Sequence, residues 1–87
     1  MKTDMITIRY FGIIRELVAQ ETEMMANPLY SDTDQLLNGL RNRGGVWAEA
    51  LAPQRIFRIA VNQRMVFDTV LIKDGDEIAI LPPVTGG

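Results

Sequence analysis

The group with the clearest chemical potential in this chain is the carboxylate of its last residue. The final six residues are Pro82, Pro83, Val84, Thr85, Gly86 and Gly87. The two glycines carry no side chain, so the carboxylate stands on a narrow backbone that could enter a slot closed to any Cβ. The prolines fix their φ angles and hold the base of this segment away from the fold. An extended tail of this length could reach roughly 20 Å, at about 3.3–3.6 Å per residue.

Few other groups in the chain could carry out chemistry. The sequence contains neither histidine nor cysteine, so it lacks the commonest general base, the commonest soft nucleophile and thiolate metal ligands. Carboxylates are present, but no close pair has the placement of an acid–base dyad. We therefore expect no self-contained catalytic site and no bound cofactor or metal. The carboxylate of Gly87 would need activation from outside, because an ionised carboxylate is a poor electrophile at neutral pH.

Length and composition favour one soluble domain over residues 1–87. Hydrophobic residues make up 47% of the chain and charged residues 23%, which is ordinary for a globular protein. Nine basic residues oppose eleven acidic ones without forming a basic stripe, so we expect no nucleic-acid partner. No apolar stretch is long enough to cross a bilayer. Residues 1–4 lead directly into a strand-like alternation and show no signal peptide, so we expect a cytoplasmic protein.

A small sheet with one main helix must position the tail. Alternating apolar residues predict strands over 5–11, 22–26, 56–61 and 77–81, with a brief strand over 64–67. A short helical turn is expected over 13–18. The main helix begins at Asp32, an N-cap with Gln35 completing a capping-box pattern, and is expected to end at Gly44-Gly45. A further short helix is expected over 46–51. The predicted core includes Leu36, Leu37, Leu40 and Trp47.

The strongest turn signal immediately precedes the last strand. The Asp-Gly step within Lys73-Asp74-Gly75-Asp76 supplies the positive φ that tight turns require. The strand that follows runs directly into the extended tail, 81–87. These elements together predict an α+β fold with a mixed sheet, a main helix packed on one face and a flexible C-terminal tail.

Three stretches resemble a known family. The sequence at 10–17 is similar to an aromatic-aromatic-small-x-x-Arg-Glu-Leu stretch, and 60–63 to a central strand and turn. Residues 74–87 are similar to the C-terminal signature, in which an Asp-Gly-Asp-Glu turn precedes one strand, Pro-Pro-Val and a terminal Gly-Gly. The family is that of the small subunits of molybdopterin synthase, which have the ubiquitin-like β-grasp fold. The resemblance covers nearly the whole chain.

The resemblance implies a sulfur carrier of molybdenum cofactor biosynthesis. An E1-like adenylating enzyme would use ATP to convert the Gly87 carboxylate into an acyl adenylate, and sulfur would then replace one oxygen. The tail, including Gly86, would insert into the large subunit of molybdopterin synthase. The thiocarboxylate would there donate its sulfur to cyclic pyranopterin monophosphate. In this scheme the carrier is a non-catalytic subunit, and its partners supply the catalysis.

Several residues are candidate contacts for these partners. These are the tail residues Pro82, Pro83, Val84 and Thr85, the apolar residues Leu81, Met65 and Phe67, and Arg15. The three apolar residues could form an exposed patch beside the tail root or belong to the core. Arg15 could contact the adenylating enzyme or the large subunit, or be an ordinary solvated arginine.

Three other functions remain open at this level. A carrier for thiazole synthesis in the thiamine pathway would use the same terminal thiocarboxylate, although such relatives tend to be shorter and lack the Pro-Pro-Val segment. A ubiquitin-like modifier would be conjugated to lysines through Gly87, and a plain interaction domain would have an inert tail. The chain also departs from the family in two ways. It has Ile80-Leu81 where many relatives have an aromatic pair, and residues 1–4 extend beyond the usual start.

Overall fold

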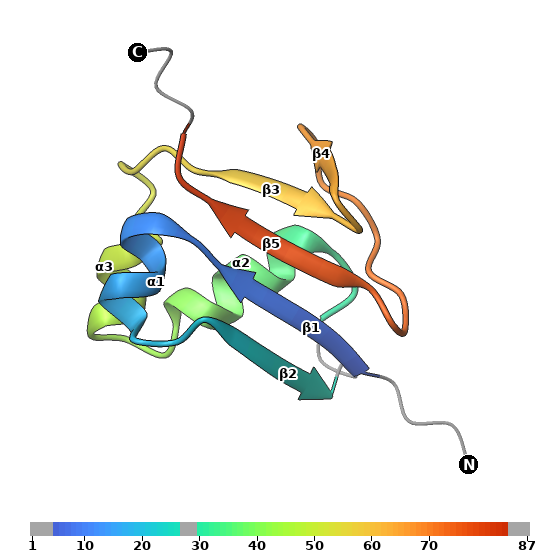
Figure 1. Ribbon diagram of the computed structural model, residues 1–87, viewed down its shortest axis with the longest axis horizontal. Helices are drawn as coiled ribbons and strands as arrows, with labels where there is room; N and C mark the ends of the chain where they lie inside the picture. The colour runs from blue at the N-terminus through green and yellow to red at the C-terminus, as the bar shows by residue number, and fades with distance from the viewer. Residues whose placement is uncertain (1–4, 27–29, 84–87) are drawn as a thin grey trace.

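One five-stranded sheet carries the fold, and the computed structural model describes it through residues 5–26 and 30–83. The elements follow in the order β1 (Met5–Tyr10), α1 (Gly12–Val18), β2 (Thr22–Ala26), α2 (Thr33–Arg41), α3 (Val46–Ala50), β3 (Arg58–Val61), β4 (Arg64–Val66) and β5 (Glu77–Leu81). The strands lie side by side in the order β2-β1-β5-β3-β4 (Figure 1). The predicted α+β class is confirmed.

The pairing of β5 decides where the chain end leaves the molecule. β5 lies in the middle of the sheet, parallel to β1 and antiparallel to β3, while β2 and β4 form the two edges by antiparallel pairing. The sheet is therefore mixed, as predicted. α2 crosses behind the sheet in Figure 1, and α1 and α3 pack together near the end at which β5 finishes.

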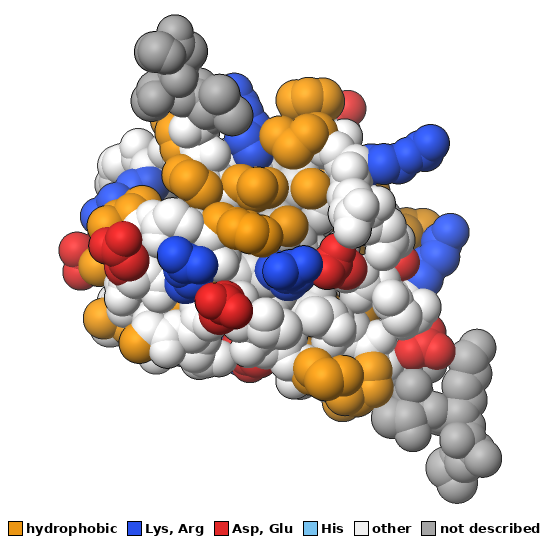
Figure 2. Space-filling view, viewed as in Figure 1, with side chains coloured by type: hydrophobic (Ala, Val, Ile, Leu, Met, Phe, Trp, Pro, Cys, Tyr) orange, Lys and Arg blue, Asp and Glu red, His pale blue; other side chains and the backbone are white. Residues whose placement is uncertain are grey.

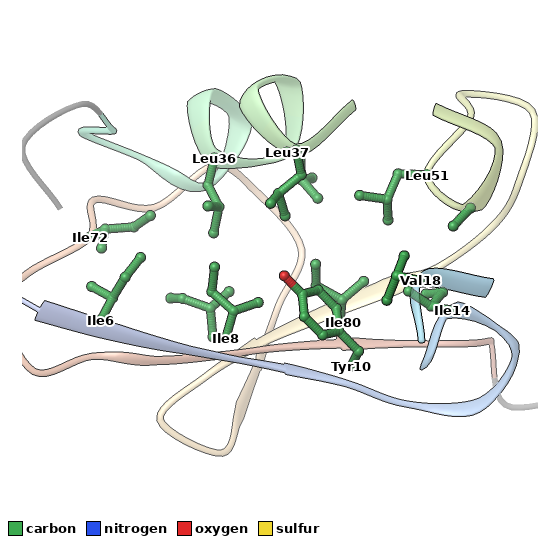
Figure 3. Packing of buried hydrophobic residues seen from close by; sticks show 13 residues of the cluster. Ile6, Ile8, Tyr10, Ile14, Val18, Leu36, Leu37, Leu51, Ile72 and Ile80 are labelled. Atoms are coloured by element: carbon green, nitrogen blue, oxygen red, sulfur yellow. The ribbon is translucent and has the colours of Figure 1, made fainter. Parts of the chain in front are cut away.

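The covered face of the sheet supplies the core. Ile8, Tyr10, Ile78 and Ile80 are fully buried, and they meet Leu36 and other apolar residues of the helices (Figure 3). The alternating burial along β1 and β5 confirms the period-two pattern of the sequence. Burying a large aliphatic side chain of this kind stabilises the fold by about 1.5–3 kcal/mol.

α2 begins as predicted and ends earlier than predicted. The backbone N–H of Gln35 donates to Oδ1 of Asp32 at 2.8 Å. The side chain of Gln35 accepts from the N–H of Ser31, one residue before the position of a regular capping box. The helix ends at Arg41, so the prediction that Gly44-Gly45 terminates it was wrong. Separate turns follow, in which both glycines have positive φ.

Packing against Tyr30 explains why a glycine, Gly39, occurs inside α2. A Cβ built at Gly39 would lie within 2.4 Å of the ring of Tyr30. The missing side chain therefore leaves room for this ring against the backbone of the helix. The position gives up helix propensity of up to about 1 kcal/mol relative to alanine.

β3 is shorter than the sequence predicted. It begins at Arg58 rather than at Ile56 because its partner β5 ends at Leu81, the residue opposite Arg58. The next residue, Pro82, has no N–H to extend the ladder. Ile56 is therefore left exposed. β4 likewise ends at Val66, one residue short of the predicted Phe67.

A polar network closes the covered face beside β2. The hydroxyl of Tyr10 donates to Glu23 at 2.9 Å, and Arg43 forms two hydrogen bonds with the same carboxylate. The guanidinium of Arg43 stacks over the ring of Trp47 at 4.4 Å. Hydrogen bonding by Arg43 lowers the pKa of Glu23, and burial raises the pKa of Tyr10. The predicted core position of Trp47 is partly met, since its ring packs edge-on against Tyr10 and is only partly buried.

Within residues 5–26 and 30–83, no helix is long and apolar enough to span a membrane.

Candidate functional site

The tail root lies at the carboxyl end of β5. Leu81 and Pro82 are partly buried and Pro83 is exposed. Val84, Thr85, Gly86 and Gly87 lie outside the described residues, so their predicted roles stay predictions.

A glycine on another element supports the tail root. The backbone N–H of Phe11 donates to the carbonyl oxygen of Ile80 at 3.2 Å, which brings the start of α1 next to the end of β5. Gly12 follows, with φ of +60°, and a Cβ built there would lie 2.7 Å from Cγ of Pro82. The proline ring thus occupies the space that a side chain at position 12 would fill. The sequence predicted no contact between Gly12 and Pro82.

An apolar groove lies beside the two prolines. Its volume is about 340 Å³, and its walls include Ile13, Ile56, Arg55, Pro82 and Pro83. Ile13 and Ile56 are 46% and 66% exposed, unusually open for isoleucine. Neither residue was predicted from the sequence to belong to a site. Nothing local in the sequence signals that positions 13, 56 and 83 meet, because the contact joins three separate elements.

The open face of the sheet carries an apolar patch next to the tail root. Register places Ala60 opposite both Met65 and Ala79, and Leu81 lies two residues further along β5 on the same face. We call Ala60, Met65, Ala79 and Leu81 the open-face patch. Figure 2 shows apolar side chains gathered over β3, β5 and β4, with charged side chains beside them. Met65 is 45% exposed, Ala79 and Leu81 are partly exposed, and Ala60 is buried. The patch therefore opens to solvent through Met65, Ala79 and Leu81.

Phe67 stands just beyond the patch. It is 80% exposed and lines a groove of about 330 Å³ between α2 and the β3–β4 edge, together with Phe57 and Val66. The structure thus brings Met65 and Leu81 onto one face and places Phe67 at the neighbouring edge. The role of all three in partner binding stays a prediction.

Arg15 lies on α1, exposed to solvent. Its guanidinium approaches the carboxylate of Glu21 at 3.6 Å. Both side chains are largely exposed, and such a pair contributes at most about 1 kcal/mol. Arg15 is therefore accessible to a partner, and the predicted contact stays a prediction.

The opposite end of β5 is held by side-chain hydrogen bonds. The N–H of Lys73 donates to Asp76 and the N–H of Met5 donates to Asp74, each at 2.8 Å. Asn62 donates from Nδ2 to Asp76 and accepts from the N–H of Glu77. The predicted turn at 73–76 is confirmed, including the positive φ of Gly75.

The described part of the chain contains no group of three or more acidic, histidine or cysteine side chains able to hold a metal ion.

The mixed sheet, the helix behind it and the chain end leaving a central strand define a ubiquitin-like β-grasp protein. Comparison with known sequences supports this class and narrows it. The ThiS family matches residues 8–87, and the chain belongs to this family.

Two curated relatives match nearly the whole chain. The molybdopterin synthase sulfur carrier subunit of Escherichia coli is 37% identical over 84 residues, covering 95% of this chain and 100% of that protein. The protein of the same name from Haemophilus influenzae is 31% identical over 83 residues, with the same coverage.

Solved structures share the fold. A solution structure from Haloferax volcanii has a TM-score of 0.76 at 25% identity and covers 98% of this chain and 88% of that chain. The small archaeal modifier protein 1 of Methanosarcina acetivorans has a TM-score of 0.73 at 20% identity, with complete coverage of both chains.

Proposed function

We propose that this protein is the sulfur carrier subunit of a molybdopterin synthase. The observation that carries the proposal is the full-length similarity to curated sulfur carrier subunits in a chain whose central strand leads to a terminal Gly-Gly. Molybdenum cofactor biosynthesis is then the pathway in which it acts. Its partners are the large subunit of the synthase and an E1-like adenylating enzyme that consumes ATP. We place this reaction in the cytoplasm, where ATP is available.

The chemistry converts Gly87 into a sulfur donor in two exchanges. The carboxylate oxygen attacks the α-phosphate of ATP and pyrophosphate leaves, which gives an acyl adenylate. A sulfur nucleophile then attacks the carbonyl carbon, and AMP departs with the bridging oxygen. The product is a thiocarboxylate, whose sulfur passes to cyclic pyranopterin monophosphate in the large subunit. The missing side chains of Gly86 and Gly87 leave room for both attacks.

The described residues support this role in two ways: they anchor the base of the tail, and they form a surface on which a partner could dock. β5 has neighbours on both sides, so the base of the tail is anchored in the middle of the sheet. The open-face patch adjoins this base. Exposed methionine suits a surface that binds two different partners, because its flexible side chain adapts to each.

The sulfur-transfer proposal is tested by intact mass. The protein is incubated with the adenylating enzyme of its host, ATP and a sulfur donor, and the product is then mixed with the large subunit and the pterin substrate. The expected result is a mass gain equal to sulfur replacing oxygen, followed by formation of molybdopterin. Conjugates with lysines of other proteins would identify a modifier, and sulfur delivery to a thiazole precursor a thiamine-type carrier. An unchanged mass would contradict all three.

The docking surface is tested with a matched pair of methionines. Met65 and Met24 are both exposed, at 45% and 65%, and register places both on the open face but at opposite edges of the sheet. Met65→Asp is expected to weaken binding to the large subunit at least about tenfold, as the loss of an interface anchor does. Met24→Asp should bind nearly as the native protein does. Equal effects measured by calorimetry would contradict the assignment.

A further inference from the structure

Among the described residues, the one lysine lies at the end of β5 remote from the tail, where Arg9 and Arg64 also lie. Of the nine basic residues, only Lys2 and Lys73 are lysines. Lys73 opens the turn before β5, where its carbonyl oxygen accepts from the N–H of Asp76 at 3.1 Å. The start of β1 lies at this end too, because the N–H of Gly75 donates to the carbonyl oxygen of Met5. The end of β5 that carries Lys73 is thus the one remote from the tail.

Among the described residues, the cations beside the tail root are arginines. Arg58 is exposed and lies directly opposite Leu81 in the sheet. Arg55 lines the groove that contains Pro82 and Pro83. Arg15 is one turn of α1 beyond the glycine that packs on Pro82.

The two kinds of cation differ in their reactivity toward an activated acyl group. A lysine amine with a pKa near 10.4 is about 0.4% neutral at pH 8, and this neutral form is a nucleophile. An arginine guanidinium stays protonated and delocalised over the whole working range of pH. A tethered amine also has an effective concentration of roughly millimolar. A lysine within reach of the tail would therefore attack Gly87 whenever its carboxyl group was activated.

The tail is long enough for such an attack at the root. The six residues from Pro82 to Gly87 can extend roughly 20 Å, and Arg58 lies in the strand next to Leu81, about 5 Å away. To reach Lys73, the tail would have to reverse at two prolines and run back along the full length of β5.

We propose that Arg15, Arg55 and Arg58 determine the specificity of acyl transfer by giving the tail end positive charge without a nucleophilic amine. This inference rests on the proposed function, in which the carboxyl group of Gly87 is activated. A lysine at these positions would form an amide with Gly87. Its nitrogen would bond to the carbonyl carbon, the activating group would leave and one proton would be released. The chain cyclised through this amide could no longer accept sulfur at Gly87.

The experiment uses the full chain prepared as a C-terminal thioester by intein cleavage, so that no adenylating enzyme is needed. Arg58→Lys and Arg55→Lys are compared with the native chain and with Arg64→Lys. Arg64 is exposed too, but it pairs with Val61, at the other end of β3 from Arg58. Each thioester is incubated at pH 8, and mass spectrometry separates the hydrolysed acid from the cyclic amide, which is lighter by one water. Fragmentation then locates the new bond.

Arg58→Lys and Arg55→Lys are expected to give at least about tenfold more cyclic amide than the native chain or Arg64→Lys, as proximity to the tail predicts. If the four proteins cyclise equally, or none does, the inference is overturned. This outcome is independent of the sulfur-transfer assay. A native chain that never gains sulfur would refute the proposed function while the thioester result still decided the role of the arginines.

Discussion

The two ends of β5 are held by different kinds of interaction. At the turn end, the side chains of Asp74, Asp76 and Asn62 accept hydrogen bonds from backbone N–H groups. These N–H groups belong to β1, to the turn and to β5. At the tail end, the support is a proline ring lying against Gly12 and one backbone hydrogen bond from Phe11. At the turn end these polar side chains form hydrogen bonds within the fold. The tail end leaves an apolar surface and an open groove exposed, which fits the proposed partner surface.

The largest expected effect comes from deleting Gly87 at the tail end. Sulfur transfer should be lost completely, because the reacting carboxylate would then stand one residue short of its partner's site. The free energy of unfolding should change by less than about 0.5 kcal/mol, since the buried core residues of the described chain all precede Pro82. Transfer is measured by molybdopterin formation and stability by urea unfolding. A truncated protein that still restored synthesis would contradict the terminal mechanism.

The buried face of the same strand should behave in the opposite way. Ile80→Ala removes a side chain that is 0% exposed and should cost about 2–5 kcal/mol of unfolding free energy. The matched change Leu81→Ala lies on the open face and should cost less than about 1.5 kcal/mol, because part of that side chain is already in water. Similar losses in urea unfolding would mean that the two faces of β5 are not as distinct as described.

At the turn end, Asn62 should matter for stability but not for transfer. Asn62→Gly removes two side-chain hydrogen bonds and should cost about 1 kcal/mol, because glycine accepts the native φ of +52°. Asn62→Ala should cost about 1 kcal/mol more, since alanine is strained in that conformation. The two variants are compared by thermal unfolding, with sulfur transfer as the control. A loss of transfer at fixed stability would show that the turn end contributes to function.

The smallest effect is expected from Glu23, which lies on β2 and outside both ends. Arg43 lowers the pKa of its carboxyl group below the ordinary 4.5, so the pair stabilises the folded state above that pH. This stabilisation is lost as the pH falls through the lowered pKa. Glu23→Gln should therefore be less stable than the native chain at pH 7, and the difference should shrink below about pH 4. Urea midpoints at several pH values measure it, and a constant difference would exclude the ion pair as its source.

Local patterns in the sequence were sufficient for most of the elements. The alternation of Ile6, Ile8 and Tyr10, the N-cap at Asp32 and the turn around Gly75 all have the predicted form. Each depends on neighbours only a few residues apart, so the chain itself contains the information. The predicted ends of the elements were less accurate. β3 starts at Arg58 because its partner strand β5 ends at Leu81, and α2 ends before its glycines.

The sequence by itself predicted where the chemistry lies, because in a chain without histidine or cysteine the Gly87 carboxylate is the clearest group to activate. Only the tertiary structure decided what surrounds the base of the tail. It brought Gly12 to Pro82, opened Met65 to solvent and placed Arg58 opposite Leu81. These contacts join residues up to 70 positions apart. Strand pairing and helix packing create them, and no local pattern of residues encodes such pairs.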